Sequence, residues 1–179
     1  MKLLFIAHFF PPSIGGMQTS NYLIVEGFMK MKMDFEVLII NDNKHYNFPF
    51  EYEKLNYKLV NLIDNFSCAI KIKDYINSVQ PDLVITLDGA IDRAIGFLIF
   101  PIKKKYKILS INSGSLLLRE KNTIKNYVSL LAYMRAEKII DASFVSQDTY
   151  KKLLKKYPQK KYNVFPLGRP ISDYFFHSK

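Results

Sequence analysis

Short, continuously apolar segments alternate with amphipathic ones along the chain. Residues 2–8 are almost entirely apolar, which is typical of a strand covered on both faces. Residues 17–32 follow, with apolar positions at helical spacing. The alternation then continues through most of the chain. It predicts further strands at residues 35–40, 57–60, 82–87, 107–111, 142–145 and 162–165, and further helices at residues 66–79, 91–103, 123–140 and 147–157.

Strands and helices that alternate in this way favour a parallel sheet with helices on both faces. At 179 residues the chain has the length of one such domain. The sequence therefore predicts one α/β domain over residues 1–179, with a Rossmann-like, doubly wound and mostly parallel sheet. Right-handed crossovers would place the strand-to-helix loops at the carboxyl edge of this sheet, where ligands bind. These loops are residues 9–16, 41–43, 88–92, 112–115 and 146–147.

The loop after the first strand is the most informative about function. Residues 8–18 read HFFPPSIGGMQ, so a glycine pair, Gly15 and Gly16, comes just before a helix. Glycines let the backbone approach a ligand closely, and the N–H groups of a helix N-terminus bind phosphate. The dinucleotide-binding pattern GxGxxG does not occur in the chain. The pattern favours a phosphate-binding loop, and the alternative is a tight turn that needs glycine only for its geometry.

Three other polar residues end predicted strands at the same edge. His8 is expected either to contact a polar ligand or to have a structural role. Asp88 would bind a ligand hydroxyl or cap the next helix, and Ser146 would contact a ligand or act as a plain N-cap. For Asp88 and Ser146 the capping role is the favoured interpretation. Arg135 is expected on the surface, with a phosphate contact as the alternative.

Cysteine and histidine usage limits the chemistry further. Cys68 is the one cysteine, which excludes an internal disulfide and favours a reducing, intracellular compartment. The three histidines are scattered, so the sequence contains no recognisable metal-ligand spacing and no metal or cofactor is expected. The longest apolar stretch, residues 94–102, has nine residues, whereas a spanning helix needs about 20.

Charge is distributed unevenly along the chain. The net charge is +10, made up of −2 in residues 1–90 and +12 in residues 91–179. A basic half indicates an anionic partner, which is a nucleic acid, a phosphorylated ligand or an anionic membrane surface. Four lysines fall at i, i+4 spacing on one predicted helix, and they form either a solvated face or a surface for anionic lipid head groups. They are Lys151, Lys152, Lys155 and Lys156.

The segment HFFPPSIGGMQ resembles the N-terminal loop of GT-B glycosyltransferases of the family-4 type. Three later segments are similar to other parts of that family, in the same order. Residues 80–89, QPDLVITLDG, look like its Pro-Asp strand, and residues 135–153, RAEKIIDASFVSQDTYKKL, look like its helix–strand–Ser stretch. Residues 163–175, NVFPLGRPISDYF, look like its exit strand, although Leu167 and Pro170 replace the usual Asn and Asp.

The resemblance implies retaining transfer of a sugar from a nucleotide donor to a glycan or lipid-linked acceptor. The chain would be the N-terminal, acceptor-binding domain. The C-terminal domain, which holds the nucleotide sugar and a Glu-x7-Glu pair, would be absent from it, so the chain alone is expected to be inactive. Asn112 stands near the position of a family histidine and is the catalytic candidate, although an amide cannot act as a base. The binding candidates are His8, Gly15, Gly16, Asp88, Ser113 and Ser146.

Two other functions stay open at this stage. One is a non-enzymatic Rossmann-like module that binds anions or nucleic acid, although no RNA-binding or helix-turn-helix signature supports the nucleic acid. The other is a sugar-nucleotide epimerase of similar two-domain build. The expected location is the cytoplasm, with association at the inner face of the membrane as a further hypothesis.

Overall fold

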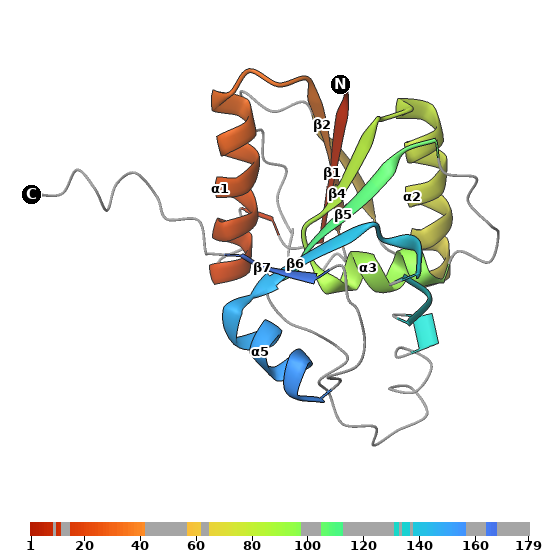
Figure 1. Ribbon diagram of the computed structural model, residues 1–179. Helices are drawn as coiled ribbons and strands as arrows, with labels where there is room; N and C mark the ends of the chain where they lie inside the picture. The colour runs from red at the N-terminus through yellow and green to blue at the C-terminus, as the bar shows by residue number, and fades with distance from the viewer. Residues whose placement is uncertain are drawn as a thin grey trace, which may run out of the picture.

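The computed structural model of the protein describes residues 1–8, 10–11, 15–41, 57–61, 65–97, 105–112, 131–132, 134–136, 138–156 and 164–167. Strands and helices alternate along it (Figure 1). In chain order they are β1 (Leu3–Ala7), α1 (Gly16–Lys30), β2 (Phe35–Asn41), β3 (Tyr57–Asn61), α2 (Asn65–Val79), β4 (Leu83–Thr86), α3 (Gly89–Gly96), β5 (Lys107–Asn112), β6 (Ala142–Ser146), α5 (Gln147–Lys156) and β7 (Val164–Leu167). Between β5 and β6, residues 131–132, 134–136 and 138–139 are helical, and we call them the 131–139 segment.

The strands form one sheet in the order β3-β2-β1-β4-β5-β6-β7, and every neighbouring pair is parallel. From β1 the chain first adds strands on one side and then, from β4 onward, on the other. The connections that leave β1 and β4 therefore diverge, and such a switch point is where doubly wound sheets bind ligands. The predicted fold class is confirmed, with a sheet that is entirely parallel in the described part of the chain.

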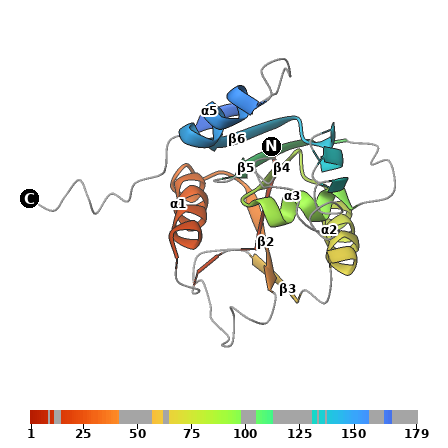
Figure 2. The same ribbon diagram turned by 90° about the horizontal axis from the view of Figure 1, so that it is seen from below.

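Helices cover both faces of the sheet, with α1 on one face and α2 and α3 on the other (Figures 1 and 2). Alternate residues of β1 serve the two layers. Leu4 and Ile6 pack into the cluster that contains α2 and α3, whereas Leu3 and Phe5 pack into the cluster that contains α1. This double burial explains the continuously apolar sequence of the first strand.

Several predicted boundaries were wrong, among them those of α3, α1 and β7. α3 begins at Gly89 rather than at residue 91, because Asp88 caps it, and it ends at Gly96 rather than at residue 103. α1 runs from residue 16 to residue 30 rather than from 17 to 32, and Lys32 has a positive φ of 54° that ends helical geometry. β7 continues past residue 165 through Pro166, because an edge strand tolerates proline. Residues 42–56, 113–130 and 157–163, with the predictions made for them, lie outside the described residues.

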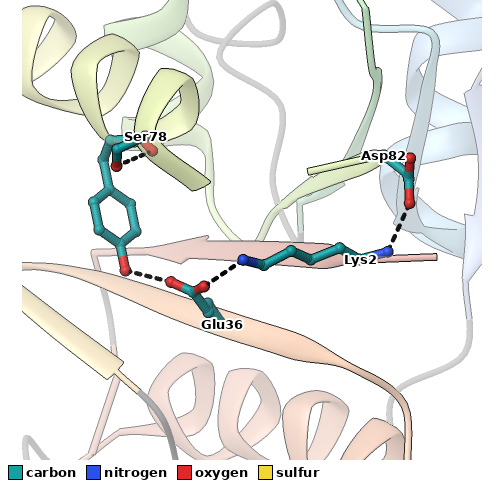
Figure 3. Close-up of polar contacts among 5 residues, drawn as sticks. Lys2, Glu36, Ser78 and Asp82 are labelled. Atoms are coloured by element: carbon teal, nitrogen blue, oxygen red, sulfur yellow. Dashed lines mark hydrogen bonds and ion pairs between the residues drawn. The ribbon is translucent and has the colours of Figure 1, made fainter. Parts of the chain in front are cut away.

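A polar network joins the strands at the amino edge of the sheet, away from the expected ligand loops (Figure 3). The Lys2 ammonium lies 2.8 Å from a carboxylate oxygen of Glu36 in β2, and the Tyr75 hydroxyl of α2 donates to the other oxygen at 2.8 Å. The backbone N–H of Lys2 donates to Asp82, just before β4, at 2.7 Å. The hydrogen bond between Lys2 and Glu36 lowers the pKa of Glu36 and raises that of Lys2. Burial, and then Glu36, raise the pKa of Tyr75, which keeps its hydroxyl a donor.

Acidification is expected to weaken the fold through Glu36. Its folded-state pKa lies below the ordinary value of 4.5, so its stabilisation is complete above that value and disappears as the pH falls through the folded pKa. The melting temperature of the protein should therefore fall on acidification below about pH 4.5. Glu36→Gln keeps an acceptor for Tyr75 but removes the ion pair, so its melting temperature should start lower and fall less steeply. Parallel acid profiles for the two proteins would contradict this assignment.

Within the described residues, no helix is both long and apolar enough to cross a bilayer. In the same part of the chain, His, Cys, Asp and Glu side chains do not gather in a group of three that could hold a metal ion.

Candidate functional site

The ends of β1 and β4 lie side by side at the switch point of the sheet. Ile6 and Thr86 are partners in the register, and the N–H of Leu87 donates to the carbonyl of Ile6 at 2.9 Å. His8 follows β1 and Asp88 follows β4, so the structure brings these two predicted site residues together. The backbone N–H of His8 donates to Oδ2 of Asp88 at 2.7 Å. The loop that leads to α1 is thus tied at its first residue to the start of α3.

Asp88 is the N-cap of α3. Its Oδ1 accepts the backbone N–H groups of Ala90 at 3.0 Å and of Ile91 at 3.2 Å, while Oδ2 is taken by His8. The carboxylate has no exposed surface. Both oxygens therefore serve backbone donors, and the structure favours the capping role over direct contact with an acceptor hydroxyl.

A second buried carboxylate, which the sequence analysis did not single out, lies one turn further along α3. Asp92 accepts the hydroxyl of Thr86 in β4 at 2.5 Å and the hydroxyl of Ser110 in β5 at 2.6 Å. All three side chains are buried. They fix the first turn of α3 to two neighbouring strands at the carboxyl edge. One signal for this role was available in the sequence. Asp92 stands beside Ile91 on the apolar face of a short helix, and a charged side chain that is buried there needs hydrogen-bond partners.

The N-terminus of α1 differs from that of α3. Gly15 is its N-cap and makes no side-chain cap bond, and its first turn contains no acidic residue. The N–H and the hydroxyl of Thr19 both donate to the carbonyl of Gly15 at 3.1 Å. The first N–H groups of a helix have no partner inside the helix. Those of α1 therefore receive no side-chain cap from the described residues, and the partial positive charge of the helix is not offset there by a carboxylate in the first turn.

Neither glycine of this loop has a backbone conformation that requires glycine. Gly15 is extended, at φ 162° and ψ 164°, and no described glycine lies in the left-handed region. A Cβ on Gly16 would meet no heavy atom within 4 Å, whereas one on Gly15 would overlap the flexible end of Gln18. No described atom fills the space beside Gly16 at the start of the helix, and the choice between a phosphate-binding loop and a tight turn stays a prediction.

Ser146 is the N-cap of α5, as the sequence analysis favoured. Its Oγ accepts the backbone N–H of Thr149 at 3.2 Å and donates to the Thr149 hydroxyl at 2.8 Å. Asp148 adds a negative charge in the first turn of this helix. α3 and α5 thus begin with a side-chain cap and an acidic first turn, and α1 begins with neither.

The remaining candidates lie at or beyond the end of β5. Asn112 is the last residue of that strand and pairs in register with Val145, but its side chain and the whole of Ser113 lie outside the described residues. The catalytic assignment of Asn112 therefore stays a prediction. Arg135 is exposed on the 131–139 segment, in agreement with the surface role favoured from the sequence.

No protein-family model and no curated protein sequence matches this chain. Solved structures do match its fold. The lipopolysaccharide outer core galactosyltransferase WaaB aligns at 16% identity and a TM-score of 0.64, over 96% of this chain and 46% of that one. An α-glucosyltransferase, solved with UDP-glucose and DNA containing an abasic site, aligns at 12% identity and a TM-score of 0.60, over 99% and 45%. The UDP-GlcNAc 2-epimerase of Methanocaldococcus jannaschii aligns at 17% identity and a TM-score of 0.58, over 94% and 46%.

The chain thus spans about half the length of each of these three proteins. At such identities the likeness concerns the fold. This agrees with the resemblance first noted in residues 8–18, and the chain has the Rossmann-like architecture of the GT-B glycosyltransferase fold over roughly half of the length that this fold occupies in its solved neighbours.

Proposed function

We propose that this chain is the N-terminal, acceptor-side domain of a retaining glycosyltransferase of the family-4 type. The enzyme would transfer a sugar from a nucleotide donor to a glycan or lipid-linked acceptor. The observation that carries the proposal is the start of α1 at the switch point of the sheet, where no described side chain caps the helix and no described atom lies within 4 Å of a Cβ on Gly16. One structural neighbour is a glucosyltransferase solved with UDP-glucose and another is a UDP-GlcNAc 2-epimerase, which supports a nucleotide sugar as the donor.

The start of α1 suits the phosphate groups of such a donor. In glycosyl transfer the leaving group is a nucleoside diphosphate, so negative charge develops on its phosphate oxygens. Unpaired N–H groups and the helix dipole stabilise that charge, and a residue without a side chain lets the phosphate come close. At α3 the same kind of donors are already occupied, because Asp88 accepts from Ala90 and Ile91. The proposal therefore assigns the phosphate to α1 and a positioning role to Asp88.

The other candidate residues have narrower roles in this proposal. His8 leaves β1 at the edge where α1 begins, and its backbone is held by Asp88. Asn112 ends β5 at the same edge and would hydrogen-bond the donor sugar or the acceptor, since a neutral amide donates and accepts but takes up no proton. Ser113 and Ser146 would complete the polar edge. The nucleotide would bind mainly to a second domain, and we expect no turnover of any nucleotide sugar by the 179-residue chain.

Backbone amide signals provide a direct test. Titration of the labelled chain with UDP should shift the resonances of Gly16, Met17 and Gln18 and leave those of Ala90 and Ile91 in place, because the latter N–H groups are bonded to Asp88. Gly16→Val should raise the Kd for UDP that is obtained from these shifts by at least about tenfold, because the side chain would occupy the approach to the helix start.

The matched control for this titration is Gly27→Val in the same helix. A Cβ at Gly27 also meets nothing within 4 Å, so both valines enter open space and neither should disturb folding. Gly27→Val should bind UDP as the unchanged chain does. Shifts centred on Ala90 and Ile91, or equal loss of binding in the two variants, would rule out α1 as the phosphate site.

The epimerase alternative rests on a specific observation, namely the fold shared with UDP-GlcNAc 2-epimerase. A domain of that kind would also meet UDP, so the titration does not separate the two functions. Product analysis separates the two functions when the chain is joined to a nucleotide-binding domain. Release of UDP together with a new glycoside indicates transfer, whereas an altered sugar still attached to UDP indicates epimerisation.

A further inference from the structure

Arg93 of α3 is a cation to which the described part of the chain offers no partner. Its Nε atom is buried and has no hydrogen-bond acceptor among the described residues. The ion pairs in that part of the chain are formed by lysines and by the amino terminus, and none of them includes Arg93. A guanidinium has five N–H donors and no acceptor, so only an acceptor brought from elsewhere can satisfy it.

The two carboxylates that precede Arg93 most closely in the sequence are engaged by other donors. Asp92 accepts the hydroxyls of Thr86 at 2.5 Å and of Ser110 at 2.6 Å. Asp88 accepts three backbone N–H groups, at 2.7, 3.0 and 3.2 Å. Both residues are buried. The acidic residues at the start of this helix therefore serve neutral donors and form no ion pair with the guanidinium.

Arg93 stands on the side of α3 that faces away from the sheet. Ile91 and Ile95 pack into the core cluster, and a position two residues from each lies on the opposite side of an α-helix. α3 begins at the carboxyl edge, where Asp88 holds the backbone of His8. Long side chains of a helix lean toward its N-terminus, which for Arg93 is the end near the ligand loops. The residue is only partly buried, so a ligand can approach it.

An unpaired Nε at a buried position indicates what kind of group would bind there. A buried donor without an acceptor destabilises a fold, and more so when it is charged. A partner that arrives with a ligand would explain such a group. In arginine, Nε and a neighbouring Nη form a planar fork that fits two oxygens of a carboxylate or a phosphate. Arg93 is therefore suited to an oxyanion.

The charge around Arg93 favours a carboxylate over a phosphate. Asp88 and Asp92 are buried carboxylates of the same helix, within about a turn and a half of Arg93. Like charges repel one another more strongly inside a protein than in water. A phosphate with two negative charges would be repelled by both carboxylates, whereas a ligand carboxylate carries one charge and matches the single guanidinium.

We propose that Arg93 binds the carboxylate of an acidic sugar, of the uronic acid class, through paired hydrogen bonds from Nε and Nη. This sugar would belong to the acceptor, and that assignment rests on the proposed function. Binding of the carboxylate itself can be measured without any sugar transfer.

The side-chain Nε–H signal of Arg93 in the isotope-labelled chain reports on this site directly, and its loss in Arg93→Met assigns it. Glucuronate should move this signal and bind at least about tenfold more tightly than glucose, which has no carboxylate. A glucose phosphate should bind more weakly than glucuronate. UDP, the probe for the start of α1, should leave the signal in place, so failure of this proposal and failure of the proposed function give different results.

Two variants at position 93 separate the fork from the charge. Arg93→Met keeps the apolar stem and removes the donors, so it should raise the Kd for glucuronate at least about tenfold. Without ligand its melting temperature should equal or exceed that of the unchanged chain, because an unpaired buried donor is lost. Arg93→Lys keeps the charge without the fork and should also weaken binding. The matched control is Arg135→Met on the exposed side of the 131–139 segment, which should alter neither measurement.

Four results overturn the proposal. They are an Nε–H signal that glucuronate does not move, tighter binding of the glucose phosphate than of glucuronate, equal weakening by Arg93→Met and Arg135→Met, and a lowered melting temperature of ligand-free Arg93→Met. The last would show that Arg93 offsets the charges of Asp88 and Asp92 within the fold and is not a ligand site. The first two use the unchanged chain, so they decide the question even if a variant folds poorly.

Discussion

Replacing Asp88 with alanine should destabilise the protein by about 3 kcal/mol. The change removes the N-cap of α3, which is worth about 1 kcal/mol, and it also leaves the N–H groups of His8, Ala90 and Ile91 without their acceptor at a buried position. Urea unfolding followed by circular dichroism would measure the loss. The loop before α1 would also lose its tie to α3, so the UDP-dependent shifts at the start of α1 should weaken in the same variant.

Two variants separate the parts of this effect. Ser146→Ala removes a simple N-cap from α5 and should lower the free energy of unfolding by only about 1 kcal/mol. Asp88→Asn keeps one oxygen for the cap but can present an NH₂ donor to His8, so its effect should lie between the other two. If Asp88→Ala proved as mild as Ser146→Ala, then Asp88 would be a cap and nothing more.

Replacing Gly96 with alanine should also destabilise the protein by about 3 kcal/mol. A Cβ at this position would overlap the backbone carbonyl of Ala132, and a backbone group cannot turn aside as a flexible side chain does. α3 and the 131–139 segment would therefore have to separate, at an overpacking cost at the upper end of the usual range. The midpoint of urea unfolding reports this loss.

Gly27→Ala is the matched control for Gly96→Ala. Both residues lie in helices, but a Cβ at Gly27 meets nothing within 4 Å. Alanine is the better helix former by about 1 kcal/mol, so Gly27→Ala should raise the free energy of unfolding. Opposite signs at the two positions are the expected result. Stabilisation by both substitutions would show that the contact between Gly96 and Ala132 is loose.

The sequence was sufficient for the parallel α/β fold because its central strands are buried on both faces. β1 must be apolar at every position when Leu4 and Leu3 pack into opposite layers, and that pattern is visible without any structure. The position of Asp88 at a strand end was enough to expect either a ligand contact or a helix cap. The choice between them needed the backbone of His8, which approaches from a strand 80 residues away.

Other parts of the site depended on contacts that no local pattern contains. Asp92 is held by Thr86 and Ser110, and these three residues meet only once β4 and β5 are in register. The contact of Gly96 with Ala132 joins α3 directly to the 131–139 segment, although β5 separates the two in the sequence. At Gly16 the sequence predicted a special role for glycine, whereas the space beside it, which no described atom fills, is a property of the folded chain.

The proline in β7 limits how this sheet can grow. β7 is the edge strand that follows β6, and Pro166 stands within it, paired in register with Val145. Proline has no N–H to donate, and its presence on an edge strand discourages pairing with another chain. Two copies are therefore not expected to join edge to edge through β7 into a longer sheet. A neighbour on this side would receive no backbone hydrogen bond from Pro166, and the exposed Phe165 beside it offers a side-chain contact instead.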